Sequence, residues 1–335
     1  LITYMQIFGM ILKDLRVNEN QLDSLNITSN TKLERLICGG NQLTSLNLEN
    51  NTKLEDLQCG MTQIASLDLQ ANVNLKKLIF DSTPITGLNL SFNPELTELR
   101  GNATELSNIQ FPENSKLASI SCHRSKLTQL DVSGLDSLGY LMIYQNELVS
   151  LDLSNNPKMR YLDCTRNNLS ELNLKNGNIA GFERMYATGN SNLDCIQVDN
   201  VAAASAKDEG DWTKDNTAVY SENCGTYVVP KTYVPDDNFE QALIDLGWDN
   251  GELDDSVATA KINERTYLDI VNKNITDLTG IEDFAALDYL NMQNNQVTSI
   301  DVSNNQNLKK LWCNGNPVSS LNLSNNPGLE DLQCR

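Results

Sequence analysis

The hydrophobic residues of this chain fall on a grid that repeats every 21 positions. One period combines apolar positions with an asparagine at each of two corners, namely Leu33, Leu36, Cys38, Asn41, Leu43, Leu46, Leu48 and Asn51. The same spacing returns in copies that begin at Leu12, Leu54, Leu75, Leu96, Leu117, Leu138 and Met159. A short period of this kind predicts a solenoid, because each unit can bury its apolar edge only against its neighbours.

Each period contains the pattern L-x-x-L-x-L-x-x-N twice, which predicts two extended stretches per turn. We call the stretch around Leu36 the first-half strand and the stretch around Leu46 the second-half strand. Alternate side chains of an extended stretch face opposite sides, so the leucines point inward and the residues between them point to solvent. Nothing between these stretches has the length and period of a regular helix. We therefore expect a flat cross-section with β structure on both sides.

The corner between the two strands favours asparagine, because its side chain bonds to turn backbone and tolerates a positive φ. The residues at this first corner are Asn20, Asn41, Asn146, Asn167, Asn295 and Asn316, with Thr62, Thr83, Thr104 or Ser125 in other turns. The grid is broken at Gly101, Leu135 and Gly177, where it expects an apolar residue or asparagine. We expect local irregularity at these three positions.

The grid is interrupted once, and the interruption predicts five segments. A first array covers residues 1–192, and a small, polar segment follows in which Trp212 and Tyr220 are the expected packing anchors. A second array then restores the 21-residue spacing at Leu287, Leu308 and Leu329. The segments after the first array are a C-terminal cap (193–226), a linker (227–233), a helical N-cap (234–265) and an incomplete second array (266–335).

The expected N-cap contains a helical pattern. Phe239, Ala242, Leu243 and Leu246 have the spacing of one helix face. Asp237 with Glu240 has the spacing of a capping box, and Gly247 stands where a C′ glycine ends a helix. The helix should therefore cover the front of the second core.

Both ends of the sequence fall inside a repeat. Leu1 and Tyr4 stand one period before Leu22 and Leu25, and the final period stops after Cys334. The first ten residues lack the basic region of a signal peptide. We expect the chain to be a mature or excised piece of a longer protein.

The grid resembles leucine-rich repeats in their nested 21-residue, IRREKO-type form. The repeat sequence, which is rich in asparagine and carries cysteine, is similar to that of surface leucine-rich repeat proteins of Bacteroidetes. The resemblance implies a leucine-rich repeat solenoid of the α/β class, β-dominated with few helices, in two tandem arrays separated by caps. It also implies a secreted or cell-surface bacterial module that binds a protein or a glycan, in adhesion for example, rather than an enzyme.

The cysteines fall into two groups. Six occupy one grid position that Val17, Phe80 and Ile143 fill in other turns, so cysteine stands there for a buried hydrophobe. Their side chains would run parallel in adjacent turns, which is poor disulfide geometry, so we expect free thiols. Cys195 and Cys224 lie off the grid at the two ends of the expected C-terminal cap, and we predict a disulfide between them that stabilises by roughly 3–4 kcal/mol. The grid cysteines are Cys38, Cys59, Cys122, Cys164, Cys313 and Cys334.

Composition narrows the choice of partners. The formal net charge is −19, which disfavours nucleic acid and anionic lipid as partners, and no apolar run is long enough to insert into a membrane. The single histidine, His123, comes without a nucleophile-elbow sequence, a zinc-binding spacing or a glycine-rich phosphate loop. The acidic stretch from Asp245 to Asp255 does not match an EF-hand, and it is best explained as a solvated surface. We expect no cofactor, no metal and no catalysis.

We expect the contact residues at the outward positions of the first-half strands, because these positions carry large and varied side chains. Rigid, large amphipathic side chains are typical of binding hot spots, although single exposed rings are also common as packing cover. The expected contact residues are Tyr140, Met142, Tyr144, Tyr161 and Arg166, with Tyr289 and Trp312 as a second patch.

Two functions are consistent with these patterns. The first is a binding or adhesion module, located outside the cell or on its outer surface, that holds a protein or a glycan on the first-half face. The alternative is a structural subunit whose copies stack head to tail, since an open heterologous contact produces filaments.

Overall fold

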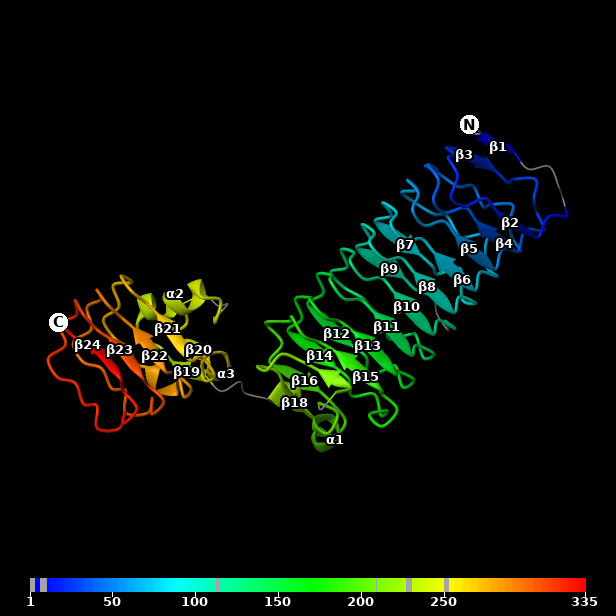
Figure 1. The fold of residues 1–335 in the computed structure, drawn as a ribbon. Helices are drawn as coiled ribbons and strands as arrows, with labels where there is room; N and C mark the ends of the chain where they lie inside the picture. The colour runs from blue at the N-terminus through cyan, green and yellow to red at the C-terminus, as the bar shows by residue number, and fades with distance from the viewer. Residues whose placement is uncertain (1–3, 7–10, 113–114, 209, 227–230, 250–252) are drawn as a thin grey trace. The chain divides into compact units, whose positions relative to one another are not determined.

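The computed structural model describes residues 4–6, 11–112, 115–208, 210–226, 231–249 and 253–335. The chain forms two compact units, Leu1–Tyr227 (unit 1) and Val228–Arg335 (unit 2). Each unit is a stack of similar turns around its own apolar core, with a parallel sheet along one side (Figure 1). The prediction of a β-dominated solenoid with few helices is confirmed.

The first-half strands of unit 1 form one parallel sheet of ten strands. Its register follows the grid: Leu36 pairs with Leu57, and Leu57 pairs with Leu78, and all three side chains are fully buried. The predicted inner columns of leucine are therefore present. In spatial order the strands are β2 (Asp14–Arg16), β4 (Arg35–Ile37), β5 (Asp56–Gln58), β6 (Lys77–Ile79), β8 (Glu98–Arg100), β10 (Ser119–Ser121), β11 (Tyr140–Met142), β13 (Tyr161–Asp163), β15 (Arg184–Tyr186) and β17 (Trp212–Thr213).

The second-half side carries strands in only part of unit 1, so the expectation of β structure on both sides is only partly right. Residues 45–47, 66–68 and 129–131 are not strands. Leu46 and Leu67 of these turns are only partly buried, whereas Leu88 and Leu151, at the same position within strands, are buried. A grid leucine can therefore face the core without strand pairing. The strands on this side are β1 (Tyr4–Gln6) with β3 (Ser24–Asn26), β7 (Gly87–Asn89) with β9 (Asn108–Gln110), and β12 (Ser150–Asp152), β14 (Glu171–Asn173), β16 (Cys195–Gln197) and β18 (Val219–Ser221).

The first turn differs from the expected register by one residue. Strand β1 pairs with β3 so that Met5 lies opposite Leu25, and Tyr4 lies opposite Ser24. The prediction that Tyr4 is the equivalent of Leu25 is wrong, because the register of the strand pair places Met5 opposite Leu25. Leu1 lies outside the described residues.

Asparagine holds the first corner through its side chain. The Nδ2 of Asn41 donates to the carbonyls of Cys38 and of Val17 in the preceding turn, both at 2.9 Å, and its Oδ1 accepts from the backbone N–H of Leu22 at 3.0 Å. The positive φ, however, falls on the residue before it, as at Gly40 (φ 67°). The expected bonding of the asparagine side chain to the turn backbone is confirmed, and its tolerance of a positive φ is not used at this corner.

The three departures from the grid have different consequences. Buried asparagines of adjacent turns form a column at the second corner, in which Asn72 donates to the backbone carbonyls of Asn51 and Leu48. Leu135 occupies this position in its own turn, where it is fully buried and cannot donate such a hydrogen bond. Gly177 adopts a φ of 76°, and its N–H donates to the carboxylate of Asp199. At Gly101 the missing side chain provides space for a large neighbour, because a Cβ there would lie 2.2 Å from Cζ of Phe80.

The grid cysteines behave as the sequence predicts, with one exception. Cys38, Cys59, Cys122, Cys164 and Cys313 are buried free thiols, and Cys334 is an exposed one. Burial raises the pKa of Cys38 and of Cys122 to about 12. These thiols therefore remain protonated and act as apolar side chains at neutral pH.

The end of unit 1 is closed by residues that follow the last regular turn. Trp212 is 1% exposed and packs against Phe182, with ring centroids 5.2 Å apart, and against Tyr220, with centroids 6.0 Å apart. A disulfide joins Cys195 to Cys224, with Cα atoms 5.8 Å apart. The short helices here are α1 (Val201–Ser205) and the 3-10 turn η1 (Cys224–Thr226).

Unit 2 begins with an antiparallel strand pair and a helix that lie before its parallel sheet. These elements are β19 (Lys231–Tyr233), α2 (Asp237–Asp245), β20 (Ser256–Ala258) and α3 (Thr259–Ile262). The sheet runs β21 (Tyr267–Asp269), β22 (Tyr289–Asn291), β23 (Lys310–Trp312) and β24 (Asp331–Gln333), with the 3-10 turn η2 (Ile281–Asp283) after β21. None of the helices in the described ranges is both long and apolar enough to cross a lipid bilayer.

Helix α2 follows the predicted pattern with two corrections. Phe239, Ala242 and Leu243 are buried, but Leu246 is 42% exposed, because the helix ends before it. Gly247 has a φ of 71° and ends the helix as predicted.

The expected capping box is wrong, because the N-cap of α2 is Asp236 rather than Asp237. Glu240 instead turns both carboxylate oxygens to the β20 side, where they accept from the backbone N–H groups of Asp254, Asp255 and Ser256. Its carboxyl group is therefore fully buried, with both oxygens hydrogen-bonded to backbone N–H groups.

We predict that Gly101→Ala destabilises unit 1 by about 1–3 kcal/mol, because the new methyl group overpacks the Phe80 ring. In a Phe80→Ala background, which lacks the ring, Gly101→Ala should cost less than it does in the wild-type chain. Urea-dependent hydrogen exchange of peptides from β6 and β8 measures the change. Gly134→Ala is the control, since no atom lies within 4 Å of its added Cβ. Equal effects at both glycines would contradict the prediction.

A second prediction concerns the pH dependence of α2. Burial alone would raise the pKa of Asp236, but hydrogen bonds from Thr276, Phe239 and Asp277 outweigh it and hold the pKa below its usual value. The carboxylate therefore stabilises the fold fully above about pH 4, and this contribution is lost as the pH falls through the lowered pKa. Asp236→Ala should cost about 1–2 kcal/mol at pH 7 and less at pH 3.

Hydrogen exchange of α2, corrected for the intrinsic rate at each pH, tests this. Asp236→Asn is the control for titration: its amide oxygen still caps the helix, it loses the bonds from Thr276 and Asp277 at every pH, and its cost should therefore not depend on pH. A cost of Asp236→Ala that stays constant between pH 7 and pH 3 would show that the charge plays no part.

Candidate binding face of the ten-stranded sheet

The outer face of the ten-stranded sheet is the surface that the sequence analysis selected. Each strand buries its central residue and turns the residues on either side to solvent. Equivalent outward residues of adjacent turns lie next to one another, at the strand spacing of about 4.8 Å. The face therefore consists of columns of neighbouring side chains, and its chemistry can be followed column by column.

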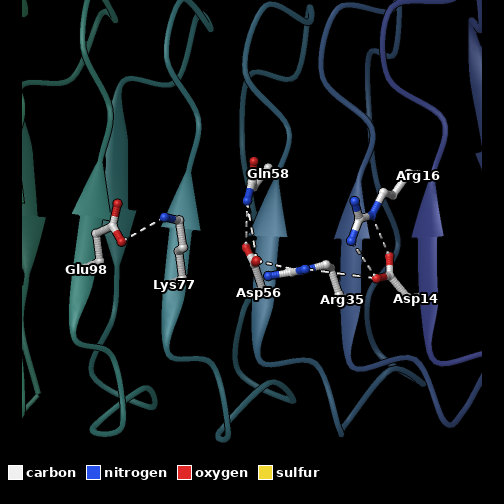
Figure 2. A network of polar contacts seen from close by, with 7 residues as sticks. All are labelled: Asp14, Arg16, Arg35, Asp56, Gln58, Lys77 and Glu98. Carbon is white, nitrogen blue, oxygen red and sulfur yellow. Dashed lines mark hydrogen bonds and ion pairs between the residues drawn. The ribbon is translucent and has the colours of Figure 1, made fainter.

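Charged residues of alternating sign fill the first outward column between β2 and β8 (Figure 2). Arg35 bonds to Asp56, with 2.8 Å between Nε and Oδ2, and it also lies 4.0 Å from Asp14. Lys77 pairs with Glu98 at 2.8 Å. The first outward column thus consists of Asp14, Arg35, Asp56, Lys77 and Glu98, in which opposite charges lie directly across adjacent strands and stabilise the pairing.

The second outward column of this region completes the network. Arg16 reaches back along its own strand to Asp14, and Gln58 donates to Asp56 at 3.1 Å (Figure 2). Arg100 donates to Asp81 at 2.6 Å between Nε and Oδ2. Each cation on the outer face of these strands therefore has a carboxylate within this chain: Arg16, Arg35, Lys77 and Arg100.

Aromatic residues replace the charges from β11 onward. The ring of Tyr140 stacks on that of Tyr161, with centroids 6.3 Å apart, and the edge of Tyr186 meets Tyr161 at 5.8 Å. Tyr140 is 42% exposed, and Tyr161 and Tyr186 are half-buried. Burial, together with the nearby charge of Asp163, raises the pKa of Tyr161, so its hydroxyl stays neutral and can both donate and accept.

A second aromatic contact lies toward the first corner. Tyr144 stacks on His123, with ring centroids 4.2 Å apart and planes 12° from parallel, and Arg124 lies 6.0 Å from the Tyr144 ring. Burial and the charge of Arg124 lower the pKa of His123, so its imidazole is neutral at pH 7. His123 thus serves as a packing partner of Tyr144 in this face.

The structure distributes the predicted contact residues over these two groups. Tyr140 and Tyr161 contact each other, Tyr144 contacts His123, Met142 is half-buried beside Asp163, and Arg166 is exposed at the first corner. The sequence analysis missed Tyr186, because the turn between β13 and β15 is two residues longer than the grid: Tyr161 pairs with Arg184. An alignment of the turns by strand pairing, rather than by the 21-residue period, places Tyr186 opposite Asp163 on the outer face.

Unit 2 has an aromatic ladder of its own. Tyr267 and Tyr289 stack with centroids 4.6 Å apart and planes 1° from parallel, and Trp312 meets Tyr289 edge-on at 5.2 Å. The indole Nε1 of Trp312 donates to Asp331 at 2.9 Å. The structure thus brings the predicted residues Tyr289 and Trp312 together, and it adds Tyr267, which is 54% exposed.

Other positions offer weaker sites. Shallow hollows on the second-half side of unit 1 are lined by small polar residues such as Ser45, Asn47, Asp68 and Gln70. In unit 2, carboxylate oxygens of Asp237, Glu240 and Asp255 lie within 4.8 Å of one another. Both oxygens of Glu240 already accept backbone hydrogen bonds, so this cluster is explained by the fold.

The stacked turns decide the type of fold. Parallel first-half strands, inner leucine columns and asparagines that bond across the corner occur together in both units. The fold is a leucine-rich repeat solenoid. No protein-family model matches the sequence, and no curated protein matches it either.

Solved structures of leucine-rich repeat proteins are similar to this chain at low identity. The functional domain of InlJ from Listeria monocytogenes, described as including a cysteine ladder, is 21% identical with a TM-score of 0.45, and the match covers 96% of this chain and 62% of that domain. The internalin InlF of the same organism is 18% identical with a TM-score of 0.41, over 96% of this chain and 87% of InlF. A leucine-rich repeat protein of Leptospira interrogans is 16% identical with a TM-score of 0.39, over 93% and 76%.

We predict that replacing Arg35 and Lys77 by Gln lowers the stability of unit 1 by about 1 kcal/mol in low salt and by little in 1 M NaCl, because their ion pairs are partly exposed and screened. The change in stability is measured from hydrogen exchange of peptides from β4 to β8 as the temperature is raised, in each salt concentration. Lys32→Gln with Lys53→Gln is the control, since it alters net charge equally at exposed positions without an ion pair among the described residues. A loss that is the same in both salts would rule out the ladder's electrostatic contribution.

Proposed function

We propose that this chain is a non-catalytic binding module whose contact surface is the aromatic patch of the ten-stranded sheet. The patch comprises Tyr140, Met142, Tyr144, Tyr161, Arg166 and Tyr186. The observation that carries the proposal is the contact of Tyr161 with Tyr140 on one side and with Tyr186 on the other, on the outer side of a continuous sheet. Partly exposed tyrosines held together on a rigid surface combine large apolar area with polar hydroxyls, as binding hot spots do.

Rigidity supports this proposal energetically. The free energy of binding becomes less favourable by about 0.5–1.5 kcal/mol for each flexible side chain that binding immobilises. Tyr161 is already restrained by rings on both sides, and the strands beneath it are hydrogen-bonded to their neighbours. Much of this ordering has therefore taken place on folding, before any partner arrives.

The partner in this proposal is a protein or a glycan outside the cell or on its outer surface. The disulfide between Cys195 and Cys224 supports this location, because such bonds persist in oxidising compartments. A bacterial origin and a role in adhesion rest on the resemblance of the repeats to bacterial surface proteins. Tyr267, Tyr289 and Trp312 form the proposed second patch, on unit 2.

We expect Tyr140→Ala with Tyr161→Ala to weaken binding by about 30-fold, which corresponds to about 2 kcal/mol, because two adjacent hot-spot rings are removed. The wild-type chain is first screened against peptide and glycan arrays, and the strongest ligand is then titrated by calorimetry. Phe92→Ala with Tyr233→Ala is the matched control, since both rings are exposed and lie outside the patch.

Unchanged affinity of the Tyr140 and Tyr161 variant, with its circular dichroism intact, would remove the patch from the proposal. Light scattering of the same samples tests the alternative function, because head-to-tail assembly would make the mass rise with concentration.

A further inference from the structure

The two halves of the ten-stranded sheet differ in how their cations are paired. Between β2 and β8, Arg16, Arg35, Lys77 and Arg100 each bond to a carboxylate of this chain. Around the aromatic patch, Arg124, Arg166 and Arg184 form no ion pair with any residue in the described part of the chain. The first group is neutralised internally, and the second retains its charge for an external partner.

These three arginines frame the patch. Arg124 lies beside Tyr144, and its Nε donates to Gln145 at 2.9 Å. Arg166 occupies the equivalent corner position two turns later, roughly 10 Å away along the stack. Arg184 lies at the opposite end of the strands, directly beside Tyr161 in the register. Positive charge is thus present at both ends of the strands that carry the rings.

The patch is locally cationic in an acidic protein. On the outward positions of β10, β11, β13 and β15 and the two residues before each first corner, the three arginines face one carboxylate, Asp163. Asp163 is itself engaged, because its Oδ1 accepts from the N–H and the hydroxyl of Thr165. The whole chain, in contrast, has 25 Lys and Arg residues against 44 Asp and Glu residues. The charges on these outward positions therefore favour an anionic partner, and the next carboxylate of the first column is that of Asp211, beside Arg184 in the register but not ion-paired with it.

Ring geometry favours a polypeptide over a sugar. Tyr140 and Tyr161 turn ring faces toward each other, and Tyr144 turns a face toward His123. A sugar ring binds aromatic residues by stacking on an open face, and the contacts of Tyr161 with Tyr140 and Tyr186 and of Tyr144 with His123 reduce the number of open faces. Hydroxyls and guanidinium groups suit a partner that offers carboxylates and backbone carbonyls, which arginine can bind bidentately.

We propose, building on the function proposed above, that the aromatic patch binds an acidic segment of a polypeptide, with Arg124, Arg166 and Arg184 contacting its carboxylates. The rings supply apolar contact area, and the arginines supply selection by charge. Because none of these arginines has to leave an internal ion pair, the contact forms without the loss of an existing one.

The test uses the full chain and three fluorescent peptides of about 12 residues, long enough to cross the patch at about 3.3 Å per residue. The peptides share one apolar pattern and carry Glu, Gln or Lys at alternate positions. Fluorescence anisotropy should show the Glu peptide binding at least tenfold more tightly than the Lys peptide. Charge reversal of Arg124, Arg166 and Arg184 to Glu should invert this order.

The matched control reverses Lys32, Lys53 and Lys175 to Glu, which changes net charge equally at exposed residues outside the patch, Lys175 lying after β14 on the second-half side. It should leave the preference for Glu intact. If the order inverts in this control as well, overall charge rather than the patch sets the preference, and the proposal is wrong.

Further outcomes separate this inference from the proposed function. Loss of all peptide binding in Tyr140→Ala with Tyr161→Ala, combined with equal affinity of the wild type for the three peptides, would keep the patch and overturn the acidic preference. Retained binding in that variant would overturn the patch itself. Arginine-dependent binding of oligogalacturonate, with no peptide bound at about 1 mM, would replace the polypeptide by an acidic glycan.

Discussion

The fold depends on the burial of one leucine in each first-half strand against the same leucine of the adjacent turns. Leu36, Leu57 and Leu78 illustrate the constraint, since each is fully buried and each lies beside the next in the register. No single turn encloses enough apolar surface to be stable alone, so the turns must stack. Once the column is fixed, the residue on either side of each leucine must face solvent. The composition of the outer face is therefore set by sequence position, and the backbone beneath it is held by hydrogen bonds on both sides.

Much of this architecture could be predicted because burial leaves a periodic trace in the sequence. The grid located the strands of the ten-stranded sheet, the buried thiols and the inner columns. It was wrong where small local energies decide. Met5 instead of Tyr4 pairs with Leu25, Asp236 instead of Asp237 caps α2, and Leu246 is exposed because the helix ends. The second-half strands were overestimated for the same reason: leucines can be packed inward there while backbone pairing between adjacent turns is absent.

The candidate site was predictable in its location but not in its membership. The outward positions of Tyr140, Tyr161, Tyr289 and Trp312 follow from alternation along a strand. Tyr186 and Tyr267 were missed because the intervening turns depart from 21 residues, so equivalent side chains no longer share a position in the period. The pairing state of the arginines could not be predicted at all. Whether Arg35 reaches Asp56, or Arg184 has a carboxylate within range, depends on side-chain geometry across strands that a linear sequence does not show.

One comparison within the sheet separates what the fold requires from what a partner requires. Strand β10 carries Ser119 where β11 and β13 carry Tyr140 and Tyr161, in the same column and with the same register. Its central residue, Ile120, is as fully buried as Leu141 and Leu162. A small polar side chain is therefore sufficient at this outward position for the turn to form. Exposed ion pairs on the other half of the face contribute little to folding as well. Stacking of turns thus explains the inner columns, whereas the clustered tyrosines and the arginines around them are not required by it, which is why the proposed binding surface is placed there.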